Sequence, residues 1–445
     1  MGEANSVVEG LPFYLRGNFA PVEQEQTAFD LAVKGSIPPQ LRGLYLRNGP
    51  NPKSDPGHWF LGDGMIHGVR LEDGKAVWYR NRWVRTRAFL EGATFVDRDG
   101  AIDRTVAKAN TNIIGHAGRL LALVESSYPT EVTAELETRG IFDFAGRLTT
   151  AMTAHPKLCP DTGEMHFFGY GFLPPFLTYH RVNAAGELVQ SVDIDVPGPT
   201  MIHDFAITEH HAVFMDLPVV FDLELALGGS MPYRWSDDYG ARLGVLPRGG
   251  SASDVRWFEI APCYVFHPFN AYEENGRLVL EGARYPELWR TGSNRFLPAR
   301  AHRWTIDLAS GTVREQPLDD RAIEFPRVDD RRNGKAARYG YAVSNHDGVS
   351  EEPSSLLKYD LRDGSVVAHD FGPGRAPGEA VFVPASADSG EDEGFLLTYV
   401  YDAARNGSEL VILDAASFAA APVATIRLPQ RVPFGFHGNW IADGY

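Results

Sequence analysis

Four histidines of this chain occur in one recurring local pattern that is suited to metal chemistry. Each lies at the end of an apolar segment and is followed at once by Pro, Asp or Gly. The four are His155 in TAHPK, His203 in MIHDF, His267 in VFHPF and His437 in GFHGN. Four imidazoles without a carboxylate suit a borderline transition metal such as iron, copper or zinc, and suit calcium or magnesium poorly. The residue types leave open which of these metals is bound.

The segment around His203 shows why such a partner is needed. PTMIHDFAIT, residues 199–208, is expected to begin a strand, with Met201 and Ile202 before the histidine and Phe205 after it. A neutral imidazole inside an apolar strand must find hydrogen-bond partners for both ring nitrogens or lose free energy. A metal shared with the other three histidines is the hypothesis for this partner.

The remaining histidines are given no ligand role, because a histidine is far more often a surface or satisfied core residue. His67 in GDGMIHG is interpreted as structural. His210 and His211 are adjacent, and neighbours in a strand point to opposite faces, so they cannot easily share a metal. Four others are expected in polar or loop surroundings: His58, His302, His346 and His369.

The four patterned histidines are separated by 48, 64 and 170 residues, so the fold must bring distant segments together. An apolar strand, a tight Gly turn and a second strand recur at residues 69–79, 179–194, 269–285, 304–318 and 358–371. Asp-Gly, Asn-Gly and Ser-Gly between such strands are hairpin signals. Repeated hairpins predict an all-β chain and favour a β-propeller over a pair of β-sandwiches. The inner strands of a propeller border one channel, where the histidines could converge.

The hairpins follow one another without a low-complexity linker, so one domain over residues 1–445 is predicted. The acidic stretch at 384–394 is interpreted as a surface loop between strands. Helices are expected only within 130–140 and 144–152, and a loop-rich insertion is expected around 222–256.

Composition narrows the partners and the compartment. A formal net charge of −16 disfavours nucleic acid and anionic membranes as partners. With only Cys159 and Cys263, no disulfide framework is expected, which favours a reducing cytoplasm. The absence of a signal-peptide pattern and of an apolar run of about 18 residues predicts a soluble protein. No G-x-S-x-G, H-E-x-x-H or Walker motif occurs, so no organic cofactor is indicated.

Longer motifs, in a fixed order along nearly the whole chain, resemble those of a known family. They run from GNFAPV and IPPQLRGLYLRNGPNP through HWFLGDGMIHGVRL, NTNIIGHAGRLLALVES and AHPKLCPDTGEMHFFGYGF. They continue with MIHDFAIT, FHPFNAYE, EFPRVD and PGEAVFVP to GFHGNW. This sequence resembles the carotenoid cleavage oxygenases, which include carotenoid, apocarotenoid and lignostilbene dioxygenases. The resemblance implies a seven-bladed β-propeller with a dome of loops and short helices over its top face.

The resemblance also implies the roles of individual residues. The four patterned histidines would hold iron(II) (Fe2+). Three glutamates would accept hydrogen bonds from the ligand rings and so orient them: Glu125 in LALVESSYP, Glu324 in IEFPRVD and Glu379 in PGEAVFVP. Without the resemblance, Glu324 could equally form an ion pair with Arg327. Thr111 in ANTNII matches a position whose side chain leans over an open coordination site of the iron.

The implied reaction is the cleavage of a carbon–carbon double bond by dioxygen to two carbonyl products. The stilbene-cleaving branch carries a lysine just before the first of the three glutamates, and here that residue is Val124. An apolar polyene, taken up by transient membrane contact, is therefore the predicted substrate, and phenolic stilbenes or phenylpropenes are the alternative. Phe172, Phe269 and Phe436 are expected either to line an apolar tunnel or to fill blade cores.

Two other classes of protein remain open at this stage. A propeller that only binds a ligand would keep the histidines for packing and would hold no metal. A propeller hydrolase or lactonase would use a divalent cation, but it would need carboxylates and Asn where the motifs place histidines.

Overall fold

Short antiparallel strands form nearly all the regular structure of the computed structural model, which describes residues 11–97, 100–344 and 354–444. The predicted hairpins are present. Strand β4 (Gly64–Glu72) pairs with β5 (Lys75–Trp83), and the turn residues Asp73 and Gly74 have φ of 49° and 73°. Two consecutive residues with positive φ form the turn whose twist matches the flanking strands. The Asp-Gly signal therefore predicts this hairpin for a physical reason.

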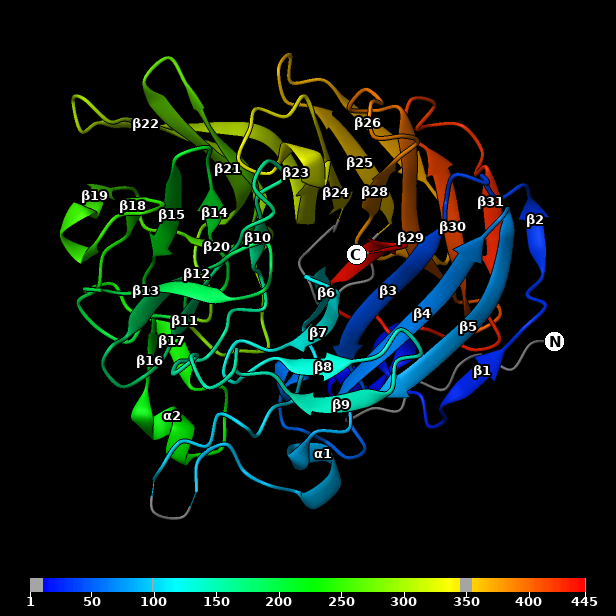
Figure 1. Cartoon of the computed structure of the whole chain (residues 1–445), viewed down its shortest axis with the longest axis horizontal. Coiled ribbons are helices and arrows are strands. Elements are labelled where there is room, and N and C mark those ends of the chain that lie inside the picture. Colours follow the sequence, from blue (N-terminus) through cyan, green and yellow to red (C-terminus); the bar gives the residue numbers. More distant parts are fainter. Residues whose placement is uncertain (1–10, 98–99, 345–353, 445) are drawn as a thin grey trace.

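The strands are arranged in sheets that succeed one another around a centre in chain order, from blue to red in Figure 1. The first sheet contains β4 and β5 with β1 (Gln26–Ala28), β3 (Gly43–Pro50) and β32 (Gly438–Ala442). The second contains β6 (Asn112–His116), β7 (Arg119–Leu123), β8 (Thr130–Val132) and β9 (Thr138–Ile141). The third contains β10 (Lys157–Leu158), β11 (Met165–Tyr170), β12 (Leu177–Val182) and β13 (Leu188–Ile194). The fourth contains β14 (Ala206–Ile207), β15 (His211–Asp216), β18 (Arg242–Pro247) and β19 (Arg256–Glu259).

The remaining strands complete the ring. A seven-stranded sheet contains β20 (Tyr264–Glu274), β21 (Arg277–Tyr285), β22 (Arg300–Asp307), β23 (Val313–Val328), β24 (Tyr339–Ser344), β25 (Ser355–Asp360) and β26 (Val366–Asp370). The last large sheet contains β27 (Arg375–Pro377), β28 (Val381–Pro384), β29 (Gly394–Asp402), β30 (Gly407–Asp414), β31 (Ala424–Arg427) and β2 (Val33–Gly35). A separate two-stranded ribbon pairs β16 (Val219–Phe221) with β17 (Tyr233–Trp235).

Strand β23 explains how these sheets make a propeller. It has 16 residues and pairs with β22 along its first part and with β24 along its last part, with register shifts in both pairings. The seven-stranded sheet is therefore two blades joined through one bent strand. With the five other large sheets, the described part of the chain forms seven blades, which confirms the predicted all-β propeller.

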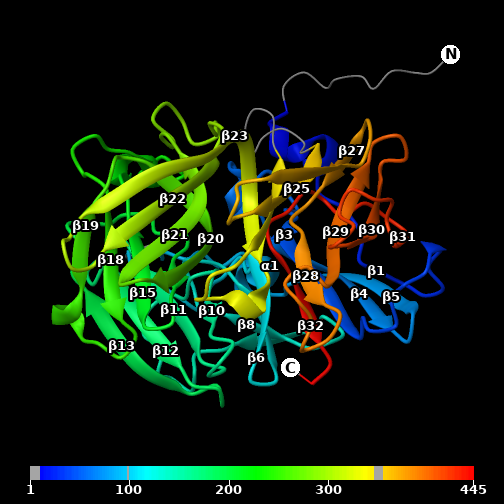
Figure 2. The same cartoon turned by 90° about the horizontal axis from the view of Figure 1, so that it is seen from above.

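Both ends of the chain exchange strands across the same seam. The red strand β32 pairs with β3 of the blue first sheet, and β2 pairs with β31 of the last sheet (Figures 1 and 2). Apolar side chains of the two sheets also pack together there, among them Tyr45, Tyr79, Tyr399 and Ile412. Because the exchange runs in both directions, the first and last blades cannot separate without losing paired strands.

Short helices lie before the first strand and in the loops between strands: η1 (Phe13–Leu15), η2 (Gly17–Phe19), η3 (Trp59–Leu61), α1 (Arg87–Glu91), α2 (Leu223–Leu227), η4 (Ala252–Asp254) and η5 (Asp330–Arg332). Ring contacts of Phe13 and Phe19 with Trp59 join η1, η2 and η3, as expected of the predicted dome. Among the described residues, no helix combines the length and apolarity that a membrane crossing requires.

Three expectations about local structure have different outcomes. The helices predicted within 130–140 and 144–152 are wrong: the first segment contributes β8 and β9, and the second forms turns. The helix-favouring AELE sequence is too short to offset the cost of helix nucleation, and β-branched residues precede it. The 222–256 segment contains α2, β17 and β18 joined by loops, and β18 belongs to the fourth sheet, so the segment is loop-rich but is in part a blade strand and not only an insertion. The 384–394 stretch joins β28 to β29 as predicted.

A glycine at the seam allows a test of the strand exchange. Gly35 ends β2 with φ of 87°, and a Cβ atom there would lie 2.2 Å from the carbonyl oxygen of Val423. Gly57 has φ of 78°, and a Cβ atom added to it would meet nothing within 4 Å, so it is a matched control for backbone strain alone. We expect Gly35→Ala to lower the free energy of unfolding by about 1–3 kcal/mol more than Gly57→Ala, because it forces β2 from β31. Equal losses in denaturation experiments on both variants would contradict this account.

Candidate metal centre

The four patterned histidines meet at the centre of the ring. One ring nitrogen from each of His155, His203, His267 and His437 lies within 4.8 Å of the others, and all four side chains are buried. Each belongs to a different blade: His267 lies in β20, and the other three immediately or closely precede β10, β14 and β32. His203 therefore lies before its strand, and not inside it as expected. The propeller brings the widely spaced histidines together as the sequence argument requires.

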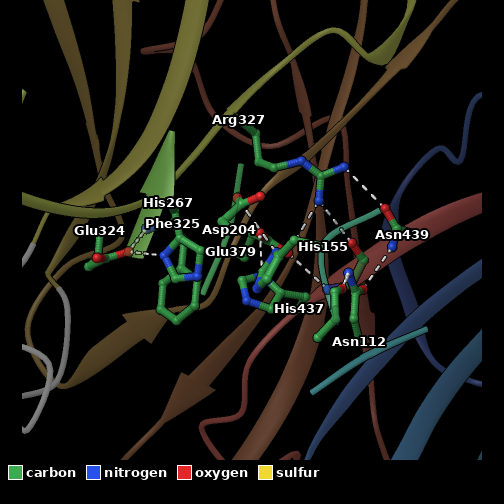
Figure 3. A network of polar contacts seen from close by, with 12 residues as sticks. Asn112, His155, Asp204, His267, Glu324, Phe325, Arg327, Glu379, His437 and Asn439 are labelled. Carbon is green, nitrogen blue, oxygen red and sulfur yellow. Dashed lines mark hydrogen bonds and ion pairs between the residues drawn. The ribbon is translucent and has the colours of Figure 1, made fainter. Parts of the chain in front are cut away.

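The rings face each other through their Nε2 atoms. The Nε2 atoms of His155 and His203 are 3.0 Å apart, and those of His203 and His267 are 3.1 Å apart. Figure 3 shows the rings of His155, His267 and His437 pointing toward a common centre. The Nδ1 atoms point outward, and three of them contact glutamates.

Each of the three predicted glutamates contacts one histidine. Glu125 contacts Nδ1 of His203. The second pair joins Glu324 Oε2 to His267 Nδ1 at 2.5 Å, and the third joins Glu379 Oε1 to His437 Nδ1 at 2.9 Å. A carboxylate only accepts hydrogen bonds, so Nδ1 must carry the proton, and in a neutral ring Nε2 then has a free lone pair.

This protonation state fits a metal ion. The lone pairs on Nε2 of His203 and His267, 3.1 Å apart, repel each other, since the protons of these two rings are on Nδ1. A cation among them would replace this repulsion by four coordinate bonds, while the carboxylates orient the rings and offset the charge. The four buried histidines could therefore hold a metal, and the absence of a carboxylate on the Nε2 side fits a transition metal.

The fourth ring, that of His155, has a different outer partner. Its Nδ1 is 3.7 Å from Oδ2 of Asp204, which is too long for a direct hydrogen bond. Asp204 is buried and forms an ion pair with Lys157 at 2.8 Å. Burial raises the pKa of Asp204, and the positive charge of Lys157 opposes that rise. The sequence analysis missed Asp204, although four ligand rings call for four acceptors and this residue directly follows His203.

Further hydrogen bonds hold the glutamates in place. Tyr170 donates its hydroxyl to Glu125 Oε2 at 2.5 Å, and the Tyr285 hydroxyl donates to Glu324 Oε1 at 2.7 Å. The backbone N–H of residue 438 donates to Glu379 Oε2 at 2.8 Å. Two of these carboxylates are therefore fixed by tyrosines, which is a support that the sequence analysis did not identify.

Arg327 supports Glu379, and not the neighbouring Glu324 that the sequence suggested as an alternative ion-pair partner. Its Nη1 is 3.5 Å from Glu379 Oε2, and its Nη2 contacts Asp330 at 3.2 Å. Figure 3 shows the guanidinium of Arg327 between Glu379 and Asn439, to whose Oδ1 it donates at 3.1 Å.

For His155, His437 and Glu379, the electrostatics favour the ionisation states that metal binding requires. At His267, burial lowers the pKa, but the charge of Glu324 outweighs it and the pKa is raised. Burial lowers the pKa of His437 to about 4, although Glu379 opposes the change, and burial together with the neighbouring rings lowers that of His155. Burial alone would raise the pKa of Glu379, but the charges of His437 and Arg327 bring it to about 2. Neutral imidazoles beside ionised carboxylates are the forms that bind a metal without first releasing a proton.

A cavity of about 790 Å³ adjoins the cluster on one side. Its walls are mainly apolar and include side chains of the dome, such as Trp59, Phe60, Phe172, Leu227 and Phe436. His203, His267 and His437 also border it, so an apolar molecule in this cavity would contact the cluster. We refer to this space as the apolar cavity.

Of the three phenylalanines expected either to line such a space or to fill blade cores, two line the cavity. Phe172 and Phe436 border the apolar cavity, whereas Phe269 packs against the ring of Tyr359, with centroids 5.6 Å apart. A register shift in β20 next to Phe269 separates it from the cavity side, and Phe266 lines the cavity instead. Of the two alternatives expected for Phe269, the structure therefore shows packing within a blade core.

Thr111 borders the apolar cavity and is buried. Its hydroxyl donates to Asn110 Oδ1 at 2.9 Å, and its carbonyl accepts the backbone N–H of His437 at 3.1 Å. The residue thus connects the cavity wall to the segment that carries one of the four histidines.

Other histidines lie outside the cluster, as predicted, but not always in the expected surroundings. His58, His302 and His369 are all buried. His58 lies in the loop before η3, as expected, whereas His302 and His369 lie in strands β22 and β26. His67 is buried with its Nδ1 2.9 Å from the Tyr79 hydroxyl, which suits a structural residue. His346 lies outside the described residues.

Comparisons with known proteins agree with the resemblance. The family model described as retinal pigment epithelial membrane protein matches residues 19–442. A carotenoid cleavage oxygenase of Mycobacterium tuberculosis is 41% identical, with 96% of this chain and 97% of the relative covered. A carotenoid 9,10(9',10')-cleavage dioxygenase of Crocus sativus is 37% identical, with coverage of 97% and 89%.

Solved structures give the same assignment. The lignostilbene dioxygenase of Pseudomonas brassicacearum superimposes with a TM-score of 0.88 at 32% identity, covering 96% of this chain and 98% of the other. A cobalt-substituted apocarotenoid oxygenase of Synechocystis gives a TM-score of 0.86 at 30% identity, with 97% and 98% covered. By its sequence, its fold and its central histidines, the chain belongs to the carotenoid cleavage oxygenase family and is a dioxygenase.

Proposed function

We propose that the chain is an iron(II)-dependent oxygenase that cleaves a carbon–carbon double bond of an apolar polyene, such as a carotenoid or an apocarotenoid. The observation that carries the proposal is the direct contact between the four-histidine cluster and the apolar cavity. In this proposal, His155, His203, His267 and His437 are the metal ligands. Glu125, Glu324 and Glu379 orient three of the rings.

When bound, iron(II) would supply the electrons that activate dioxygen, so that one double bond and one dioxygen molecule give two carbonyl groups. The residues of the chain would orient the histidine rings and bind the substrate. The glutamates keep Nδ1 protonated and the rings fixed, which keeps Nε2 available toward the metal. The aromatic walls of the cavity hold the apolar substrate beside the cluster and exclude water.

The walls of the apolar cavity support a polyene as the substrate. A long hydrocarbon gains about 25 cal/mol for each Å² of apolar surface that it buries, and it needs no polar partner. Val124, which precedes Glu125, borders the cavity and adds an apolar side chain there. The relatives from Mycobacterium tuberculosis and Crocus sativus are named for carotenoid cleavage.

A phenolic stilbene or phenylpropene is the second candidate substrate. It is supported by the similarity to the lignostilbene dioxygenase and by polar side chains in the mainly apolar cavity, among them the tyrosines Tyr170 and Tyr233. The Tyr170 hydroxyl already donates to Glu125, so its capacity for a phenol is limited to accepting a hydrogen bond.

We also propose that the chain is a single domain that works in the cytoplasm. The strand exchange between first and last sheets supports one domain, because neither terminus can leave without disrupting a blade. Cys159 and Cys263 are both free and buried, as expected in a reducing compartment. A single domain should unfold in one thermal transition. Two separate transitions in the thermal unfolding of Gly57→Ala, the control variant described for the seam, would contradict the single domain.

The exposed leucines near the apolar cavity support a transient membrane contact that delivers substrate. Leu223 and Leu227 of α2 are 62% and 81% exposed, and Leu90 of α1 is 61% exposed. Both helices border the cavity, and they lie at one edge of the molecule in Figure 1.

Replacing Leu223 and Leu227 together by serine should weaken co-sedimentation with phosphatidylcholine vesicles about tenfold, since apolar contacts with lipid are lost. Val367→Ser, on β26, is the control, and equal binding by both proteins would refute the contact.

The metal centre predicts graded effects from one histidine and its carboxylate. Purified protein should contain about one iron per chain, and His203→Ala should abolish metal retention because a ligand is lost. Glu125→Gln keeps the shape of the side chain but removes its charge, so it should weaken metal affinity or turnover by about 10–100-fold. Elemental analysis and oxygen uptake with an apocarotenal would measure both effects.

His116→Ala is the control for these variants, because His116 lies on the surface side of β6 and outside the cluster. It should retain iron and activity. Full occupancy by zinc with activity in the absence of iron would rule out the oxygenase proposal, and so would wild-type iron content in His203→Ala.

The choice between the two substrate classes can be tested at Val124. A buried phenol without a partner costs about 1–3 kcal/mol, so Val124→Lys should raise the ratio of kcat/KM for 4-hydroxystilbene over apocarotenal at least about tenfold. Val124→Met is the control for side-chain length without charge and should leave the ratio nearly unchanged. The assay compares the aldehyde products of the two substrates under air with iron(II). Efficient cleavage of isoeugenol or hydroxystilbene by the wild type, without cleavage of any apocarotenoid, would favour the phenolic candidate.

A further inference from the structure

A second, smaller cavity of about 170 Å³ lies against the histidine cluster. His267 and His437 border both cavities, whereas His203 borders only the apolar cavity and His155 only the smaller one. The cluster therefore stands between two compartments. The smaller compartment, here called the polar passage, has several charged or amide side chains in its wall: Asn112, Lys157, Asp204, Arg327, Asp330 and Asn439.

The polar passage connects the cluster to solvent. At its outer end, the side chain of Asp330 is 64% exposed. At its inner end, the side chain of Asp204 is only 3% exposed and lies 3.7 Å from His155 Nδ1. Figure 3 shows Asp204, Arg327 and Asn439 on the outer side of the histidine rings. A polar path thus runs from the surface to the one ring that no glutamate holds.

The charges along this path favour a cation. Lys157 is paired with Asp204 at 2.8 Å, and Arg327 is paired with Asp330 at 3.2 Å and lies 3.5 Å from Glu379. Two cations therefore face three carboxylates, which leaves an excess of one negative charge. Because the positive groups are already paired, a passing cation meets little net repulsion and finds carboxylate and amide oxygens as temporary ligands.

The apolar cavity offers no such help to an ion. A hydrated divalent cation that entered between its aromatic walls would lose hydration and would meet the positive charges of Arg104 and Lys108. The carboxylates in these walls, Glu125 and Glu324, are already engaged by a histidine and a tyrosine each. For a hydrocarbon the preference is reversed. Burial of its surface against the apolar walls is favourable, whereas paired charges offer it no favourable contacts.

We propose that the polar passage is the route by which a divalent metal ion reaches and leaves the histidine cluster, with Asp204 as the last carboxylate before His155. This inference rests on the proposed role of the four histidines as metal ligands. It assigns metal and substrate to opposite sides of the cluster.

A reversible plug in the passage would test the route. Asn333 borders the passage, is half-buried, and makes only a long hydrogen bond of 3.4 Å to the Leu158 carbonyl, so Asn333→Cys should fold. The native cysteines are buried, so alkyl methanethiosulfonates of increasing size should label residue 333 selectively. We expect the largest adduct to slow both Co²⁺ uptake by the metal-free protein and Co²⁺ extraction by a chelator about tenfold or more. The equilibrium affinity should not change, and reduction by a phosphine should restore both rates.

Two comparisons make the measurement specific. Leu227→Cys carries the same adduct at the apolar cavity, where its side chain is 81% exposed, and metal exchange should keep its wild-type rate. Asp330→Asn removes the outer carboxylate without a plug and should slow Co²⁺ uptake a few-fold relative to Asp363→Asn, a change on an exposed turn elsewhere.

The outcomes separate this route from the proposed function. Bound Co²⁺ whose exchange is unaffected by the adduct at residue 333, or is slowed by the adduct at residue 227, would overturn the route alone. A wild-type protein that binds neither Co²⁺ nor Fe²⁺ would overturn the proposed function, and the route with it.

Discussion

The hydrogen bonds from Nδ1 of the central histidines to carboxylates are the interactions on which the rest of the site depends. Each of them fixes two properties at once, because it orients the ring and it determines which nitrogen carries the proton. His267 with Glu324 and His437 with Glu379 show the direct form, at 2.5 and 2.9 Å. Without these acceptors, the Nε2 atoms would be free to take protons and to hydrogen-bond to one another, and the cluster would lose its capacity to hold a metal.

These hydrogen bonds in turn depend on closure of the propeller. His437 precedes β32, which pairs with the first sheet, whereas Glu379 precedes β28 of the last sheet. The His437–Glu379 pair therefore spans the same seam that the strand exchange closes. His267 lies on β20, and Glu324 lies on the last part of β23, which pairs with β24 of the next blade, so this pair joins two blades that one continuous strand connects. A loosening of the seam would disturb His437 before the other three histidines, which links the stability of the ring to the geometry of the cluster at its centre.

The sequence allowed prediction where local rules or long motifs govern the outcome. The Asp-Gly pair at 73–74 predicts a hairpin, because these two residues readily adopt the positive φ that the turn requires. The local motifs likewise predict which four histidines lie together at the centre. Which glutamate meets which ring could not be deduced, because each pair joins segments 57 or more residues apart. Local propensity failed at 130–140, where pairing with β7 outweighed it. The sequence could not decide between cavity and blade core for Phe269, because the register shifts in β20 determine the direction of that side chain. Asp204 escaped notice because its relation to His155 exists only in three dimensions.

The two sides of the cluster differ in a way that the chemistry of the reactants explains. Apolar walls stabilise a hydrocarbon but destabilise an ion, and paired charges do the reverse. A single channel could not suit both, since a polar group placed in it for the ion would lose its hydrogen bonds to water whenever the hydrocarbon entered. Here the histidine rings form the partition, with Phe172 and Phe436 on one side and Asp204 and Asn439 on the other. The propeller permits this division because its axis reaches the surface in two directions, so one end can be covered by the apolar dome while the other stays polar.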